Sequence, residues 1–340
     1  MALSPTASIS ASQINIELGR SATAQFSWND ATYQKLIDQF TSNIDTNSAR
    51  GSTYLAAGTN ANLFTLAGSP ATVTTYKFCL DSGRTIGGTG SSPAVTFGQF
   101  PSGSTVRLNN YGAIIGYGGT ADTGGGAGSG GDAINANRPN QTVVINNKSG
   151  ATVYGGGGGG GVGGSGGTGG TGGGGYYDQY MTQTCGNPGG YTYAVDTGVG
   201  CAKNTNYFNQ YNRYYTSGGS GGGGGSGGSG GVGQGYNQSA TAGSVGAGGS
   251  GGAAGGTNAG AGGTGGQGGT GGAGGAFGVA GSAGSSGAGG ATGASGNNGA
   301  GAGGSSGAGG APGGAAGNYL VKGAASVTFN NSGTVAGGLI

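Results

Sequence analysis

Aromatic side chains that could contact another molecule gather in one segment, residues 176–217. Nine of the chain's 17 tyrosines lie in it, together with Asp178, Asp196, Lys203 and Arg213. The candidate contact residues are Tyr176, Tyr177, Tyr180, Tyr191, Tyr193, Tyr207, Phe208, Tyr211, Tyr214 and Tyr215. Tyrosine offers a large contact area at little entropic cost, so the segment is predicted to bind a sugar or a protein loop. The alternative is a lid that covers one end of the neighbouring structure.

Two of the three cysteines lie in the same segment. A disulfide between Cys185 and Cys201 would stabilise the fold by about 3 kcal/mol, because it restricts the unfolded chain. The alternative is two separate thiols, as in a reducing cytosol. The sequence leaves both possibilities open, and Cys79 lies apart from them in a predicted strand.

Catalytic chemistry finds little support in the residue types. The chain has no histidine, which excludes Ser-His and Cys-His nucleophile pairs. Three cysteines without histidine make a zinc site improbable, and the nine acidic residues are scattered. The glycine runs lack the Lys-Ser/Thr pair of a phosphate-binding loop. We therefore predict no enzymatic activity, no cofactor and no bound metal.

Charge and hydropathy exclude two further classes of partner. The formal net charge is +2 and only 6% of the residues are charged, so no nucleic-acid partner is predicted. No apolar run reaches the ~18 residues of a membrane span. The opening residues "MALSPTASIS" lack the basic and apolar regions of a secretory signal. If the protein works outside a cell, we expect it to leave by another route, such as lysis or assembly into a particle.

Glycine, at 97 of 340 residues, dominates what surrounds the aromatic segment. Before it, Val162, Ser165, Thr168 and Thr171 lie three residues apart, with two glycines in every gap. After it, glycine occupies every third position at Gly281, Gly284, Gly287, Gly290, Gly293, Gly296 and Gly299. A three-residue period matches the polyproline-II type of helix and neither an α-helix nor a strand.

This period predicts a bundle of polyglycine-II helices over residues 156–317, held mainly by backbone hydrogen bonds and interrupted by the insert 176–217. Two alternatives compete with the bundle. A flexible linker has a similar composition. A collagen triple helix has one glycine per triplet, but it also needs abundant proline, and Pro312 is the only proline after Pro188.

Three matching units are predicted to form β structure. They read "TVRLNNYGAIIGYGG" from Thr105, "VVINNKSGATVYGGG" from Val143 and "SVTFNNSGTVAGGLI" from Ser326. Each has an apolar strand, an Asn-Asn corner and a second strand, and asparagine tolerates the turn that such a corner needs. We predict a β-strand repeat domain over residues 51–155 and a closing β unit over residues 318–340.

The first 50 residues contain the helical signals. "SASQINIELG" reads as a short helix. In "NDATYQKLIDQFTSNI", one apolar stripe at helical spacing comprises Tyr33, Leu36, Ile37, Phe40 and Ile44. Residues 1–50 are interpreted as a docking or assembly region, and the alternative is simply a stable amphipathic helix. The predicted fold class is thus mainly β, with a small N-terminal helical region and a glycine-rich sandwich.

The opening "ISASQINIELGRSATAQFSWNDATYQKLI" resembles an N-terminal segment of many bacteriophage tail and tail-fibre proteins. The matching residues are Gln13, Asn15, Glu17, Leu18, Gly19, Ser21, Ala22, Thr23, Ala24, Gln25, Asn29 and Asp30. The close, "YLVKGAASVTFNNSGTVAGGLI", is similar to the terminal strands of glycine-rich phage tail proteins. The middle resembles, in style, the glycine-rich sandwich of distal tail-fibre adhesins.

The resemblance implies a non-enzymatic protein of a virion tail or the cell exterior that displays the tyrosine-rich segment to a host receptor. The implied receptor is a glycan or an outer-membrane protein. The other implied partners are tail or fibre subunits and further copies of the chain, as a trimer or a polymer. An alternative is a self-assembling extracellular filament or tubule subunit related to tail proteins. A third interpretation is an ice-binding protein, whose expected flat face of threonine and alanine is not clear in this sequence.

Overall fold

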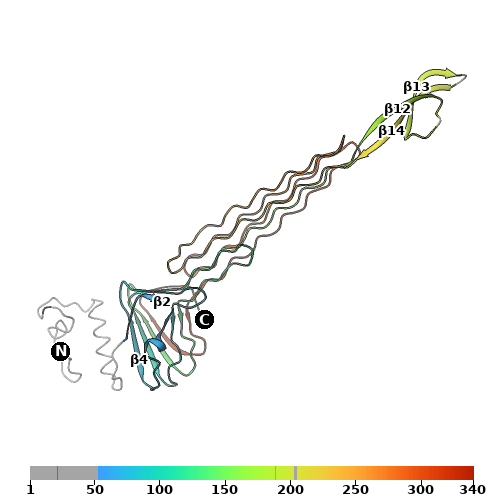
Figure 1. Ribbon diagram of the computed structural model, residues 1–340. Coiled ribbons are helices and arrows are strands. Elements are labelled where there is room, and N and C mark those ends of the chain that lie inside the picture. The colour runs from blue at the N-terminus through green and yellow to red at the C-terminus, as the bar shows by residue number, and fades with distance from the viewer. Residues whose placement is uncertain (1–20, 22–52, 188, 203–204) are drawn as a thin grey trace.

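The computed structural model describes residues 21, 53–187, 189–202 and 205–340. This part of the chain is mainly β and has three parts: a β-helix at the base, a long glycine-rich shaft, and a small sheet at the far end of the shaft (Figure 1). The predicted helices of residues 1–50, with the stripe from Tyr33 to Ile44, lie outside the described residues.

Strands at the base form three parallel five-stranded sheets. The first sheet runs in the order β1 (Thr53–Leu55), β4 (Thr75–Leu80), β7 (Thr105–Asn110), β10 (Thr142–Asn147) and β16 (Ser326–Asn331). The second contains β2 (Gly58–Thr59), β5 (Thr85–Gly87), β8 (Ala113–Ile115), β11 (Thr152–Tyr154) and β17 (Thr334–Ala336). The third contains β3 (Ala61–Asn62), β6 (Val95–Thr96), β9 (Ile134–Asn135), β15 (Asn318–Val321) and β18 (Gly338–Leu339).

The chain visits the three sheets in turn, so each circuit adds one rung to a parallel β-helix. Five rungs stack in this way, and a four-residue helix, α3 (Leu63–Leu66), follows the first rung. Inward residues of successive rungs, such as Val106, Val143 and Ile145, are fully buried. Alternation of inward and outward side chains along each strand produces this core.

The three repeated units predicted from the sequence lie directly on one another as β7, β10 and β16. The predicted turn at each Asn-Asn pair is wrong, because the two asparagines are the last two residues of their strand. The pairs align in register, and their side-chain amides form two ladders. In the outer ladder Asn330 donates to Asn146 and Asn146 to Asn109, at 2.8 and 2.7 Å. The repeats therefore stack within one chain, and the closing unit 318–340 adds strands to the same sheets as residues 51–155.

The inner amide ladder is buried except at its exposed end, Asn331. Asn110 donates to Asn147 at 2.9 Å and Asn147 donates to Asn331 at 2.8 Å. Asn110 and Asn147 are 0% and 1% exposed. Since buried amides need partners, each of these asparagines depends on the rung beside it.

The shaft is an insertion into the fourth rung of the β-helix, between β11 and β15. It contains six long segments without strand or helix: residues 155–174, 217–235, 240–256, 259–276, 279–296 and 299–317. Backbone hydrogen bonds join neighbouring segments at every third residue, as in the series from Gly157, Gly160 and Gly163 to Gln234, Gly231 and Gly228. The three-residue period predicted from the sequence is thus the period of the bonding. The polyglycine-II helix itself stays a prediction.

Segment 155–174 lies at the centre of the shaft, hydrogen-bonded to the segments 217–235, 259–276, 279–296 and 299–317. A Cβ atom at Gly163 would overlap the carbonyl oxygen of Gly269, and one at Gly164 would overlap that of Ala308. Two positions in every three must therefore be glycine. The third position faces outward, and Ser165 is exposed there.

The unbroken glycine run 155–161 has a separate cause. At the base of the shaft the short segment 116–122 also packs against the central segment. A Cβ at Gly156 or Gly159 would overlap carbonyl oxygens of that short segment. The short segment ends at Asp122, whose carboxylate accepts the N–H of Val162 at 3.2 Å, and side chains begin at this position.

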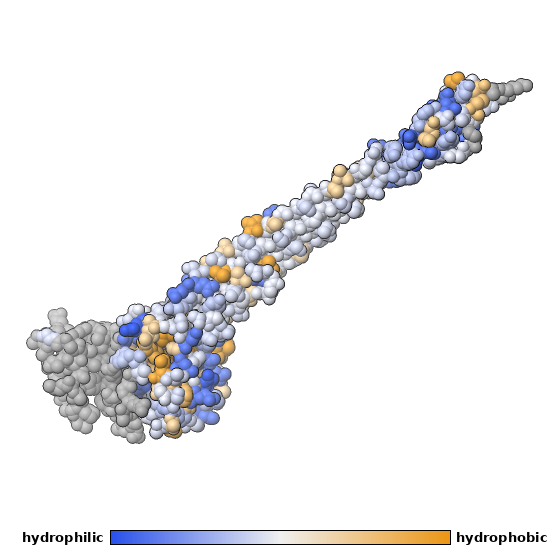
Figure 2. Space-filling view, viewed as in Figure 1, coloured by the Kyte–Doolittle hydropathy of each residue, from blue (hydrophilic) through white to orange (hydrophobic). Residues whose placement is uncertain are grey.

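The outer segments 279–296 and 299–317 tolerate more side chains because they have fewer neighbours. Gly303 and Gly309 have open space where a Cβ would lie. The shaft surface is of intermediate hydropathy, with isolated hydrophobic residues (Figure 2). Among the described residues no helix is long and apolar enough to cross a membrane.

Candidate functional site

The tyrosine-rich segment forms a three-stranded antiparallel sheet at the end of the shaft farthest from the β-helix (Figure 1). Its strands are β12 (Gly175–Cys185), β13 (Tyr193–Ala202) and β14 (Thr205–Thr216), with β14 in the middle. We call this sheet the tip. Long strands rich in tyrosine and threonine favour a sheet, because such side chains pack well across neighbouring strands.

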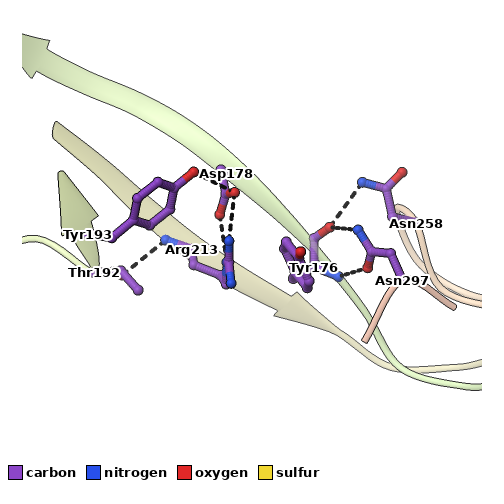
Figure 3. A network of polar contacts seen from close by, with 7 residues as sticks. All are labelled: Tyr176, Asp178, Thr192, Tyr193, Arg213, Asn258 and Asn297. Atoms are coloured by element: carbon purple, nitrogen blue, oxygen red, sulfur yellow. Dashed lines mark hydrogen bonds and ion pairs between the residues drawn. The ribbon is translucent and has the colours of Figure 1, made fainter. Parts of the chain in front are cut away.

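Two turns of the shaft hold the start of β12 through asparagine side chains (Figure 3). The backbone N–H of Tyr176 donates to Asn297 Oδ1 at 2.8 Å. The carbonyl oxygen of Tyr176 accepts from Asn297 Nδ2 at 3.0 Å and from Asn258 Nδ2 at 2.9 Å. At the end of β14, Thr216 Oγ1 donates to the carbonyl oxygen of Thr257 at 2.7 Å. Both strands that enter the shaft are therefore fastened to it.

Arg213 is the centre of a polar cluster on the tip (Figure 3). Its Nε and Nη2 atoms donate to the two carboxylate oxygens of Asp178 at 2.8 and 2.9 Å. The guanidinium lies 3.8 Å from the ring centre of Tyr176 and 5.1 Å from that of Tyr193. Tyr193 also donates its hydroxyl to Asp178 at 2.6 Å. Arginine suits this position because its planar group can pair with a carboxylate and stack on rings at once.

These contacts keep the pair ionised. Hydrogen bonds from Arg213, and then from Tyr193, lower the pKa of Asp178. The same carboxylate raises the pKa of Arg213 and that of Tyr193. The charges are satisfied within the tip, which makes the cluster a structural element that orients the surrounding rings.

The sheet register distributes the predicted contact residues over two faces. On the face of Arg213 lie Tyr176, Tyr180, Tyr193, Tyr207, Tyr211 and Tyr215. On the opposite face, which we call the Tyr214 face, lie Tyr177, Phe208 and Tyr214. Tyr191 precedes β13 and is half-buried.

Ring contacts support this division. Tyr193 stacks on Tyr211 with ring centres 5.2 Å apart, and Tyr177 stacks on Tyr214 at 5.5 Å. The exposed tyrosines of the tip are Tyr177, Tyr180, Tyr207, Tyr214 and Tyr215. Three half-buried ones, Tyr176, Tyr193 and Tyr211, are held by Arg213 or by other rings. The first group can contact a partner, whereas the second fixes the sheet.

A disulfide joins Cys185 to Cys201, with an S–S distance of 2.07 Å. It links the two edge strands, β12 and β13, at the end of the tip that points away from the shaft. Cys79 is a free, buried cysteine of the β-helix.

Sequence reasoning missed the asparagines that fasten the tip. Asn258 and Asn297 lie in the turns "GGTNAG" and "SGNNGA". The available signal was that these turns interrupt the three-residue glycine period. The sequence shows Asp178 and Arg213 only as charges of the insert, because their pairing depends on a strand register that the sequence does not reveal.

Comparison with known proteins gives one family match. A family model described as "Phage tail fibre adhesin Gp38" matches residues 39–246, which is 208 of the 340 residues. A structural match is the gp37-gp38 adhesin tip complex of the bacteriophage S16 long tail fibre, at 17% identity and a TM-score of 0.34, covering 97% of each chain. No curated protein matches the sequence.

Proposed function

This chain belongs to the phage tail fibre adhesin Gp38 family, a structural and adhesive component of the virion tail, and we propose that the tip is its host-contacting part. The proposal rests on the position of the tip in the molecule. Its exposed tyrosines lie at the end of the shaft, as far from the β-helix as the described chain extends (Figure 1). A binding residue at this point meets a cell surface before the rest of the chain.

The shaft suits the task of a spacer. We propose that its segments are polyglycine-II helices, because their backbone bonding repeats every three residues. A segment of 18 residues then spans about 55 Å at a rise of about 3.1 Å per residue. Each backbone hydrogen bond stabilises the shaft by only roughly 1 kcal/mol. The stiffness of the shaft therefore comes from the number of these bonds and from anchoring at both ends.

Attachment to the fibre is proposed for the opposite end of the molecule. Residues 1–50 and the β-helix would contact a neighbouring tail-fibre subunit, as gp38 accompanies gp37 in the adhesin tip complex of phage S16. Because the five rungs of the β-helix stack within one chain, the β core needs no second copy to form.

The proposal is tested by removing the tip from a phage that carries this protein. Residues 176–216 are replaced by Gly-Asn-Asn-Gly, the sequence that already closes the shaft turn at residues 296–299. We expect particles that retain the adhesin, as checked by mass spectrometry, but whose adsorption to host cells falls to background. Unchanged adsorption would contradict the proposal. So would purified wild-type chain that forms long polymers without other tail proteins.

A further inference from the structure

We infer that the tip is enclosed on both faces by a concave protein receptor, rather than laid against a flat surface. This inference rests on the proposed host contact and specifies the kind of partner. It starts from the distribution of exposed rings over the two faces of a single sheet that no other part of the described chain covers.

Each face presents exposed aromatic side chains. Tyr180 and Tyr215 are 52% and 67% exposed on the Arg213 face. Tyr177 and Tyr214 are 39% and 40% exposed on the Tyr214 face. Exposed aromatic side chains do not stabilise an isolated sheet in water, and clusters of them commonly mark interaction surfaces. A flat partner could cover only one of the two clusters.

The tip is the inserting partner because it is convex. It is a single three-stranded layer at the end of a narrow shaft (Figures 1 and 2). Small ligands are bound in concave sites. A single layer with exposed rings on both faces is the convex partner, so the concave surface of the complex belongs to the receptor, and walls that face each other across the tip are those of a folded protein.

The charge of the tip indicates what lines that mouth. Residues 176–217 contain two acidic and two basic residues, so their formal net charge is zero. Asp178 and Arg213 satisfy each other, and Asp196 accepts from Gly198 N and Asn206 Nδ2 at 2.8 and 3.0 Å. The exposed contacts of the described tip include tyrosine rings and hydroxyls, the apolar side chains of Met181, Val195 and Val199, and the amides of Gln179 and Gln183. These groups favour a largely uncharged wall with apolar patches and hydrogen-bonding groups.

The tip is also prepared for insertion. The disulfide ties its edge strands, the Asp178–Arg213 pair and the stacked rings hold its middle, and Asn258 and Asn297 fasten its base. A preformed surface loses little conformational entropy on binding. These fixed contacts keep both faces in shape without a partner.

The test compares matched variants of the two faces on phage that carry the full chain. The first is Tyr180→Ala with Tyr215→Ala, and the second is Tyr177→Ala with Tyr214→Ala. We expect each pair to lower the adsorption rate constant on host cells at least about tenfold, as for central aromatic residues of an interface. A control, Val245→Ala with Val279→Ala, removes exposed apolar side chains from the shaft and is expected to leave adsorption unchanged.

Folding of each variant is checked separately. The side chain of Arg213 is 28% exposed and paired, so an intact tip should resist trypsin at this residue.

A second matched set adds bulk without removing a ring: Gln179→Arg on the Tyr214 face and Gln183→Arg on the Arg213 face, both at exposed positions. If the receptor encloses the tip on both faces, each of the two arginine substitutions should block adsorption.

The inference is overturned if the variants of one face adsorb within twofold of wild type while those of the other do not, which is the result for a flat receptor. It is also overturned if neither face matters; deletion of the whole tip then shows whether the proposed function fails too. The protein nature of the receptor is tested on treated cells. Proteinase K is expected to lower adsorption, and loss after periodate oxidation of sugars, with proteinase-treated cells unaffected, would overturn it.

Discussion

Arg213 and Asp178 face each other across paired strands of the tip, and Arg213 donates a hydrogen bond to each carboxylate oxygen, at 2.8 and 2.9 Å. The same guanidinium lies over the Tyr176 ring, whose backbone is bound by Asn258 and Asn297 of the shaft. One charged pair thus connects the middle of the tip with its attachment to the shaft.

Replacing Arg213 by lysine should loosen the tip while leaving the β-helix intact. Lysine keeps the positive charge but loses the two-pronged pairing with Asp178 and the planar stacking on Tyr176. We expect faster amide hydrogen exchange in β12 and β14, measured by mass spectrometry. The matched control is Lys322→Arg, a basic residue that follows β15 in the β-helix. Equal exchange in Arg213→Lys and wild type would contradict the role given to the pair.

Acid should destabilise the tip through Asp178. Its pKa in the folded state is lowered from an unfolded value of about 3.9, so the pair stabilises folding above that value and the contribution disappears as pH falls through the folded pKa. Hydrogen exchange in β14 should therefore rise between about pH 5 and pH 2, after correction for intrinsic exchange. In Asp178→Asn this component of the pH dependence should vanish. If both proteins respond alike, another group is responsible.

Alkali should act on the same cluster through Tyr193. Its hydrogen bond to Asp178 raises the pKa of the hydroxyl above the usual value of about 10. A raised pKa contributes stability below the unfolded value, and this is lost as pH rises through the folded value. Burial also raises the pKa of Tyr54 in the β-helix, so ultraviolet titration should show late-titrating tyrosines in both proteins, with one fewer in Tyr193→Phe than in wild type. An unchanged titration curve in that variant would contradict the assignment.

Glycine should be essential in the centre of the shaft and replaceable on its outside. Gly163→Ala places a Cβ against the carbonyl oxygen of Gly269, and we expect a loss of about 1–3 kcal/mol in unfolding free energy. Gly303→Ala meets open space, and the reduced entropy of the unfolded chain should make it neutral or stabilising by about 0.4–1 kcal/mol. Thermal or chemical unfolding measures the stability of the two variants, and Gly163→Ala should be the less stable one. Equal losses at both positions would contradict the packing described.

The buried amide ladder should be a weak point of the β-helix when interrupted. Asn147→Ala leaves Asn110 and Asn331 without their shared partner, at a cost of about 1–3 kcal/mol. Asn330→Ala removes an exposed amide at the end of the outer ladder and should cost less. The melting temperatures of the two variants report the difference, and a larger loss in Asn330→Ala would contradict it.

Much of the architecture is predictable from short-range pattern. The spacing of Val162, Ser165, Thr168 and Thr171 predicts the bonding period of the shaft, and the Asn-Asn pairs predict the repeated β unit. Membership of a phage tail-fibre family was expected from motifs at both ends of the chain, and the family model matches the residues between them, 39–246. Each of these features repeats along the sequence or is contained in a few consecutive residues.

Features that depend on distant pairing were not predictable. Nothing near Gly156 indicates that residues 116–122 pack beside it, although this contact explains the unbroken glycine run. The sequence predicts a contact loop or a lid for the insert. It does not predict the three-stranded sheet, because the register that pairs Tyr176 with Tyr215 is set by the whole insert. The shaft residues Asn258 and Asn297 lie 82 and 121 positions from Tyr176, beyond any local signal.

The central claim, that the tip is the host-contacting part, is tested most directly by competition. Host cells are incubated with purified full-length chain or with chain in which Gly-Asn-Asn-Gly replaces residues 176–216, and phage adsorption is then measured. We predict that the full-length chain blocks adsorption in a concentration-dependent manner and that the chain without the tip does not. Equal blocking by both chains would place the receptor contact elsewhere and contradict the claim.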